Sequence, residues 1–205
     1  MLWKYALCVI VAYFLGSFNG AVVTSRLFFH EDVRTKGSGN AGLTNFHRNY
    51  GGWITLLVIF IDMGKMVGAA LLARYVLPGD PDLASMIAGF AVLIGHLFPA
   101  IFGFRGGKGI LSAASLSLVL DWRIFVITLA VFIAVFAFTN YVSLGSILGC
   151  IVYGICYAIF FPMQPAVWII AMIMALLAIF MHRGNIQRLL RGEERKTYLL
   201  KSKGE

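Results

Sequence analysis

Charged residues and cysteines are scarce in this 205-residue sequence. Asp, Glu, Lys and Arg together make up 13% of it, whereas 60% of its residues are hydrophobic. Its three cysteines lie in apolar runs, at Cys8, Cys150 and Cys156, without a CxxC pair or a histidine at metal-ligand spacing. The sequence therefore predicts neither a disulfide framework nor a zinc site, and we expect no bound metal.

Several catalytic motifs are also absent. The chain has no GxxxxGK[ST] loop, which argues against ATP hydrolysis, and we expect no cofactor. It has no Ser-His-Asp or Cys-His order, which disfavours a covalent acyl-enzyme. No small-x-small cleavage site follows the apolar stretch after Lys4, so we expect that stretch to remain as a mature helix rather than a signal peptide.

The hydrophobic content is far higher than a soluble core of this size would bury. Mean hydropathy is +0.86, and the charged residues lie between the apolar runs rather than along one face of each. This pattern predicts an integral membrane protein instead of surface-lying amphipathic helices. The net charge of +8 could indicate nucleic-acid binding, but the basic residues fall in short loops beside apolar spans, which favours the positive-inside explanation.

The apolar runs predict an all-α, polytopic membrane helix bundle with seven transmembrane helices in a single domain, residues 1–205. The fourth run is short, because a helix over 106–120 extends about 22 Å against a hydrocarbon layer of about 30 Å. A pore-lined or partly re-entrant helix is an alternative there. The predicted spans are 3–29, 52–77, 83–104, 110–120, 124–138, 144–161 and 166–181.

The basic residues are distributed unequally between the two faces of such a bundle. The face opposite the tail holds only Lys4, Arg74 and Arg123. This bias predicts an N-terminus outside and a C-terminal tail in the cytoplasm. The cytoplasmic set is Arg26, Arg34, Lys36, Arg48, Arg105, Lys108, Arg183, Arg188, Arg191, Arg195, Lys196, Lys201 and Lys203.

Three polar stretches share an affinity for anions. Gly37-Ser38-Gly39-Asn40 offers backbone N–H groups and a hydroxyl, and Gly106-Gly107-Lys108-Gly109 places a lysine at the start of a helix. Downstream, His182 and Asn185 lie on one side of a helical turn. We predict that these stretches bind phosphate groups at one membrane face. The alternative for the second stretch is a helix-breaking turn that carries one lysine.

Two charges lie inside the second predicted span. Asp62 and Lys65 share a helix face and can neutralise each other, because either charge alone would be costly at that depth. A structural ion pair is one interpretation and a direct role in the site is the other. His96, at the end of an apolar run, is likewise either a structural histidine or part of the site.

Four motifs occur in order along nearly the whole chain. They are Asp32-x-Arg34-x-x-Gly37-Ser38-Gly39-Asn40-x-Gly42-x-Thr44-Asn45-x-x-Arg48; Gly95-His96-x-x-Pro99 with Gly106-Gly107-Lys108-Gly109; Ser143-Leu144-x-Ser146-Ile147; and His182-x-x-Asn185-Ile186-x-Arg188-Leu189 with Gly192-x-Glu194-x-Lys196. Together with Asp62-x-x-Lys65, this pattern resembles the bacterial acyl-phosphate:glycerol-3-phosphate acyltransferase (PlsY) family.

The resemblance implies a seven-helix enzyme of the bacterial cytoplasmic (inner) membrane, with its active site facing the cytoplasm. Such an enzyme transfers a fatty acyl group from acyl phosphate to the sn-1 hydroxyl of glycerol 3-phosphate. The products are lysophosphatidic acid and phosphate, in the first step of bacterial phospholipid synthesis. The resemblance implies membrane lipid as surroundings, no nucleic acid and no obligate protein partner, and we expect the acyl chain to lie between helices, open to lipid.

The resemblance also implies roles for individual residues. Both substrates carry phosphate, and an acyl phosphate is already activated, so positioning and charge neutralisation matter more than a nucleophile. The catalytic set is Ser38, Lys108, His182, Asn185 and Glu194, and glycerol 3-phosphate is assigned to Asn45, Arg48, Lys108, His182 and Asn185. The acyl-phosphate head group is assigned to Gly37, Ser38, Gly39, Asn40, Gly106, Gly107, Gly109, Ser143 and Ser146, with His96, Asp62 and Lys65 as supporting residues.

One departure from the family pattern concerns the site. Asn140 stands where a basic residue usually precedes the Tyr-Val-Ser-Leu stretch, so a phosphate contact is expected to be lost or moved to Arg105. The proton of the attacking hydroxyl goes to His182, Glu194 or the donor's own phosphate, and the sequence leaves these three open. A small-anion transporter and a lipid phosphatase are the alternative functions, although we find no internal repeat of the kind that would favour a transporter.

Overall fold

The computed structural model describes residues 2–198, which form helices and connecting loops without a strand. Lys201 and Lys203, which belong to the predicted cytoplasmic set, lie outside the described residues. The elements in chain order are α1 (Leu2–Ser17), α2 (Gly20–Phe29), the 3₁₀ turn η1 (Val33–Thr35), α3 (Leu43–Tyr50), α4 (Ile54–Val76), α5 (Pro81–Leu97), the 3₁₀ turn η2 (Ala100–Phe102), α6 (Ile110–Leu120), α7 (Trp122–Thr139), α8 (Val142–Phe160), α9 (Pro165–Met181) and α10 (Arg183–Leu190).

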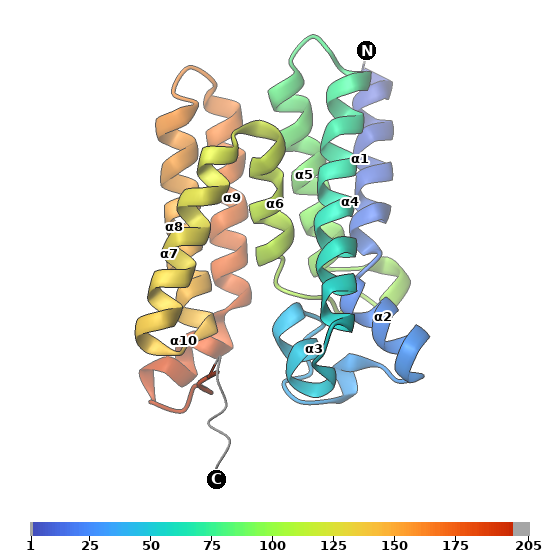
Figure 1. The fold of residues 1–205 in the computed structure, drawn as a ribbon. Helices are drawn as coiled ribbons and strands as arrows, with labels where there is room; N and C mark the ends of the chain where they lie inside the picture. Colours follow the sequence, from blue (N-terminus) through green and yellow to red (C-terminus); the bar gives the residue numbers. More distant parts are fainter. Residues whose placement is uncertain (1, 199–205) are drawn as a thin grey trace.

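The long helices run side by side as two groups with α6 between them (Figure 1). One group consists of α1, α4 and α5, and the other of α7, α8 and α9; α6 contacts α4 and α5 on one side and α7 on the other. The short helices α2, α3 and α10 gather at one end of the bundle, whereas α1 begins at the opposite end. The polar segments of the chain are therefore collected at a single end.

The apolar helices are long enough to cross a bilayer several times. Four of them pass as spans by length and hydropathy within the described residues: α4, α5 with η2, α7 and α8. Two bent pairs, α1 with α2 and α9 with α10, pass when each pair is taken together, with bends of 43° and 56°. The expected multi-pass helical membrane protein is thus confirmed, and α6 is the short helix that the sequence predicted.

The first predicted span, 3–29, is a bent pair of helices, and its break lies in the polar cluster at 16–20 that interrupts this apolar run. The chain breaks at Phe18–Asn19, and Asn19 caps α2 by accepting a hydrogen bond from the Val22 N–H at 3.1 Å. An asparagine side chain competes with the helix for backbone groups, which favours a new helix start here. The Asn19 amide also donates to the Ala41 carbonyl at 2.9 Å, so the break is tied to the loop before α3.

Two glycines allow α1 and α5 to approach closely. A Cβ atom on Gly95 would lie 2.1 Å from the Tyr13 carbonyl oxygen, and one on Gly16 would lie 2.2 Å from the Val92 carbonyl oxygen. No side chain fits at either position without separating the helices. Such small residues are typical of helix contacts in membranes, where close backbone approach replaces the hydrophobic driving force.

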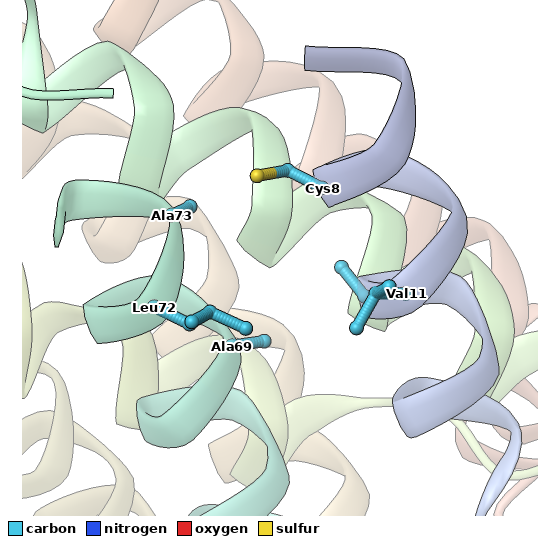
Figure 2. Close-up of a pocket in the computed structure, with 6 residues that line it drawn as sticks. Cys8, Val11, Ala69, Leu72 and Ala73 are labelled. Atoms are coloured by element: carbon cyan, nitrogen blue, oxygen red, sulfur yellow. The ribbon is translucent and has the colours of Figure 1, made fainter. Parts of the chain in front are cut away.

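The space between α1 and α4 is almost filled. A void of about 10 Å³ remains there, and Figure 2 shows Cys8, Val11, Ala69, Leu72 and Ala73 around it. This volume is about that of one water probe, and its lining is apolar, so it is a packing defect rather than a binding site.

Candidate active site

One large cavity collects the polar stretches that the sequence singled out. Its volume is about 1030 Å³, and it lies among the loop before α3, the start of α6, and helices α7 to α10 with the tail that follows. Ser38, Lys108 and Asn185 come from three distant parts of the chain and all line it. The predicted site residues among its lining are Gly37, Ser38, Asn40, Asn45, Arg48, Asp62, His96, Lys108, Gly109, Ser143, Ser146, His182, Asn185 and Glu194.

The loop at residues 36–42 is held in shape by Asn45. The Asn45 carbonyl oxygen accepts from the Ser38 N–H at 2.9 Å, and its amide donates to the carbonyls of Val33, Lys36 and Asn40 at 3.0–3.1 Å. Gly37 and Gly39 have φ of 57° and 71°, the left-handed region that glycine favours. The amide of Asn45 is therefore engaged by the loop itself, so the role that the structure gives this side chain is to shape the loop.

The loop at residues 106–109, here called the lysine loop, differs in one respect from the predicted phosphate-binding loop. The N–H groups of Gly106 and Gly107 donate to the carbonyls of Leu97 and His96, both at 3.1 Å. The expectation that these two N–H groups bind the acyl-phosphate head group is therefore wrong for this conformation, because the turn uses them. The donors that remain are Lys108 and the N-terminus of α6, where Gly109 (φ 75°) leads into a helix without a side-chain cap.

Gly107 lies where the lysine loop approaches the loop at residues 36–42. A Cβ atom there would lie 2.3 Å from Nε2 of His96 and 2.8 Å from the Ala41 carbonyl oxygen. The His96 ring is 3% exposed, so it cannot move aside. Gly107 is thus needed for close approach of the lysine loop to the loop at 36–42, which places Lys108 at the cavity.

Lys108 is the central cation of the cavity. Its ammonium group donates to Oδ1 of Asn185, which joins the loop before α6 to α10. Burial lowers the pKa of Lys108 to about 8, and the nearby guanidinium groups of Arg188 and Arg48 act in the same direction, whereas the Glu194 carboxylate opposes them. A clustered set of positive charges of this kind is suited to a phosphate dianion.

Glu194 connects the C-terminal tail to helices α8 and α10, which line the cavity. Its carboxylate accepts hydrogen bonds from the Ser143 hydroxyl, the Asn185 amide and the Arg188 guanidinium, each at 2.7 Å. Burial alone would raise the pKa of Glu194, but the hydrogen bonds from Asn185, Ser143 and Arg188 lower it. A carboxylate satisfied by three donors is a weak base, so the geometry favours a positioning role for it.

The backbone conformation at position 140 explains why asparagine is found where the family pattern has a basic residue. It ends α7 with φ 60° and ψ 12°, a left-handed conformation that asparagine tolerates better than lysine or arginine. Its carbonyl accepts from the Thr197 N–H at 2.9 Å, and Arg48 donates to the Thr197 hydroxyl. Asn140 therefore helps to hold the tail across the mouth of the cavity.

His182 presents one particular nitrogen to the cavity. Its Nδ1 lies 2.8 Å from the Ala178 carbonyl oxygen, and since a carbonyl only accepts, Nδ1 carries the proton. Nε2 is then left as an acceptor. The side chain is 3% exposed and lies near the Lys108 ammonium, two conditions that disfavour the imidazolium form.

Asp62, Lys65 and His96 form a buried cluster beside the cavity. The Lys65 ammonium lies 2.8 Å from Oδ1 of Asp62 and 2.9 Å from Nδ1 of His96. It also donates to the carbonyls of Gly16 and Phe18 at 3.1 Å each. The ion pair of the structural interpretation is therefore present, and the cluster also borders the site, because Asp62 and His96 line the cavity.

Arg188 is the residue of this site that the sequence analysis left without a role. It lies three residues after Asn185 on α10, lines the cavity, and reaches Oε2 of Glu194 with its Nε at 2.7 Å. The signal was available, since a basic residue at this spacing shares the helix face with Asn185. Arg188 is part of the fourth motif, but its contact with Glu194 depends on how α10 and the tail fold together, so the motif alone did not give it a role.

The fold and the cavity define a multi-pass helical membrane protein with a basic, anion-suited site at one end of its bundle. A family model described as glycerol-3-phosphate acyltransferase matches residues 6–192. The glycerol-3-phosphate acyltransferase of Thermoanaerobacter sp. (strain X514) is 40% identical over 190 residues, covering 93% of this chain and 94% of the relative. The enzyme of the same description from Clostridioides difficile (strain 630) is 40% identical over 200 residues, with coverage of 95% and 96%.

Solved structures agree with these relatives. The crystal structure of PlsY, an integral membrane glycerol 3-phosphate acyltransferase, in its glycerol 3-phosphate form superposes with a TM-score of 0.87 at 33% identity, covering 95% of this chain and 96% of that one. Its lysophosphatidic acid form gives a TM-score of 0.84 at 31% identity, with 95% of each chain covered. The chain therefore belongs to the glycerol-3-phosphate acyltransferase family and is an acyltransferase, which confirms the family expected from the motifs.

Proposed function

We propose that this protein transfers a fatty acyl group from acyl phosphate to the sn-1 hydroxyl of glycerol 3-phosphate. The hydroxyl oxygen attacks the acyl carbonyl carbon, the bond between that carbon and the phosphate oxygen breaks, and lysophosphatidic acid and phosphate leave. The observation that carries the proposal is the convergence of Ser38, Lys108 and Asn185 on one cavity. The solved PlsY forms that hold glycerol 3-phosphate and lysophosphatidic acid support the acceptor and the product.

The two phosphate groups bind to different parts of the cavity. We assign glycerol 3-phosphate to Lys108, Asn185, His182 and Arg48, which lie on the loop before α6, at the junction of α9 and α10, and on α3. The donor head group is assigned to the loop at 36–42 and the N-terminus of α6, with Ser38, Asn40, Gly109, Ser143 and Ser146. Fixed cations and N–H dipoles are suited to the charge that develops on the leaving phosphate.

The geometry favours the donor's phosphate as the acceptor of the proton. Glu194 is a weak base because three hydrogen bonds satisfy it, and His182 is a weak base because it is buried beside Lys108. The leaving phosphate becomes more basic as its bond to the acyl carbon breaks. The proton of the attacking hydroxyl therefore moves to the departing phosphate oxygen as the bond between that oxygen and the acyl carbon breaks.

The proposal includes the topology of the chain. Seven spans, with α6 as the short fourth and each bent pair as one, place the start of α1 outside and the site on the cytoplasmic side of the bacterial inner membrane. The opposite ends at which α1 begins and α10 lies support an odd number of crossings. The basic loops beside the cavity support the cytoplasmic orientation. Residues 1–205 are proposed to act as one unit.

The test is an acyltransfer assay with purified protein, palmitoyl phosphate and radiolabelled glycerol 3-phosphate. We expect lysophosphatidic acid from the parent protein and a loss of at least about a hundredfold in kcat/KM for Lys108→Ala. Lys4→Ala is the matched control, because Lys4 is an exposed lysine near the start of α1, which begins at the opposite end of the bundle.

Three results would contradict the proposal. Equal activity of Lys108→Ala and the parent would remove the lysine from the site. Undiminished phosphate release without glycerol 3-phosphate would indicate a lipid phosphatase. Uptake of glycerol 3-phosphate into liposomes without any acyl transfer would indicate a transporter.

A further inference from the structure

The inner part of the cavity is an apolar groove between four helices. Three of them, α7, α8 and α9, contribute a stripe of residues at helical spacing, so one face of each borders the space, whereas α6 contributes its first turn, residues 110–114. On α8 the stripe runs from Ser143, at the polar end, through Gly149 to Tyr153. The other two stripes are Phe125, Thr128, Leu129 and Phe132 of α7, and Met174, Ala175, Ala178 and Met181 of α9.

The lining ends part-way along each helix, after Ala114 on α6 and Tyr153 on α8 and before Phe125 on α7 and Met174 on α9. Beyond these ends lie residues that do not line the cavity and are 0% exposed: Ser117 on α6, Ile124 on α7, Tyr157 on α8 and Ala171 on α9. The Ser117 and Tyr157 hydroxyls lie 3.2 Å apart and join two of these helices. A packed layer therefore closes the groove along its axis, and Tyr153, which is 4% exposed, is the last residue of α8 above that layer.

The length of the groove follows from helix geometry. Ser143 and Tyr153 are ten residues apart on α8, so the groove extends about 15 Å from the head-group end to the Tyr153 ring. Gly149 lies six residues from Ser143, at about 9 Å. A Cβ atom on Gly149 would meet nothing closer than the Thr128 carbonyl oxygen at 3.7 Å, so glycine is not needed there for helix packing.

We propose that Tyr153 and Gly149 determine the length of acyl chain that the enzyme accepts. The absence of a side chain at Gly149 keeps the groove open past its midpoint, and the Tyr153 ring ends it. The inference rests on the proposed acyltransfer, in which the acyl chain of the donor enters the groove from the phosphate end. Each methylene that finds no room in the groove loses the packing contacts that the groove would give it.

Three variants test this inference with opposite expected signs. Gly149→Leu fills the groove about 9 Å from the head group and should lower the ratio of kcat/KM for palmitoyl phosphate to that for decanoyl phosphate by at least about tenfold. Tyr153→Leu shortens the closing side chain and should raise the same ratio by at least about twofold, because methylenes beyond the present end of the groove gain packing contacts. Tyr153→Phe keeps the ring, and the Tyr153 hydroxyl has no hydrogen-bond partner in the described structure, so the ratio should stay unchanged.

The ratio of two donors does not depend on how much of a variant folds. Gly149→Leu and Tyr153→Leu with the ratio of the parent would overturn the inference, and so would a Tyr153→Phe ratio that moves as far as that of Tyr153→Leu. A parent protein that transfers neither acyl group would contradict the proposed function instead. The two failures are therefore distinguishable.

Discussion

The charge of Lys108 should set the alkaline limit of the reaction. Its pKa is lowered to about 8, by burial first and then by Arg188 and Arg48, from an ordinary value of 10.5. Lysine binds phosphate only in its charged form, which dominates below the pKa and disappears above it. At pH 9 about a tenth of Lys108 remains charged, so kcat/KM for glycerol 3-phosphate should fall about tenfold for each pH unit above 8.

Protonation of the substrate should determine the acidic side of the same pH profile. The second proton of a phosphate monoester leaves near pH 6, so kcat/KM should rise through about pH 6 and stay level up to about 8. The assay measures kcat/KM with subsaturating glycerol 3-phosphate between pH 5.5 and about 9.5, with hydrolysis of the acyl phosphate subtracted from blanks without enzyme. The profile should be bell-shaped, and its falling limb should report the pKa of Lys108 in the free enzyme.

Two variants separate Lys108 from other groups that titrate. A guanidinium stays charged throughout this range, so Lys108→Arg should lower kcat/KM at pH 7 but lose the falling limb. Glu194→Gln removes the one nearby charge that raises the pKa of Lys108, and the limb should move to lower pH. A parent profile that stays flat to pH 9.5, or an unchanged limb in Lys108→Arg, would refute the assignment.

Three further predictions concern residues around the cavity. Gly107→Ala should lower kcat at least about a hundredfold, because its Cβ would lie 2.3 Å from Nε2 of His96, whereas Gly68→Ala, with nothing within 4 Å, should keep full activity. Lys65→Met leaves the buried Asp62 carboxylate unpaired and should cost about 3–5 kcal/mol of unfolding free energy in detergent, and adding Asp62→Asn should recover part of that loss rather than add to it. Asn140→Ala should lower the unfolding free energy by about 1 kcal/mol while Asn140→Gly stays near the parent, since φ there is 60°.

The sequence predicted the apolar helices well because hydropathy reports burial in lipid directly. The predicted fourth span, 110–120, coincides with α6 (Ile110–Leu120), and the predicted fifth, 124–138, is α7 to within two residues at each end. The sequence missed α3 and predicted only the first turn of α10; both helices are eight residues long and carry polar side chains at the cavity. Helices of that length and polarity form through tertiary contacts, so the hydropathy of the sequence does not predict them.

The sequence predicted which residues come together at the cavity better than it predicted the directions of their polar atoms. The motifs identified the side chains that line the cavity, Lys108 and Asn185 among them. They could not show that the N–H groups of Gly106 and Gly107 turn toward Leu97 and His96, because glycine allows both directions of the peptide plane. Nor could they show which way the Asn45 amide points, which depends on three carbonyls of a folded loop.

The backbone groups at the break between α1 and α2 explain why a membrane helix tolerates the buried ion pair of Asp62 and Lys65. The break between α1 and α2 leaves carbonyls without helical donors and the Gly20 N–H without a helical acceptor, and in hydrocarbon such groups are costly. Lys65 donates to the carbonyls of Gly16 and Phe18, and Asp62 accepts from Gly20 at 3.1 Å, so each charge satisfies the helix end of opposite polarity.

The break in turn makes the phosphate site possible. Because α2 leaves α1 at 43°, Asn19 reaches the Ala41 carbonyl and holds the loop at 36–42 beside the cavity. The same Lys65 ammonium contacts His96, whose ring packs on Gly107 and so fixes the lysine loop. One cluster of buried charges therefore helps to set the positions of both loops that we propose to bind phosphate, and a substitution there should impair binding of both substrates together.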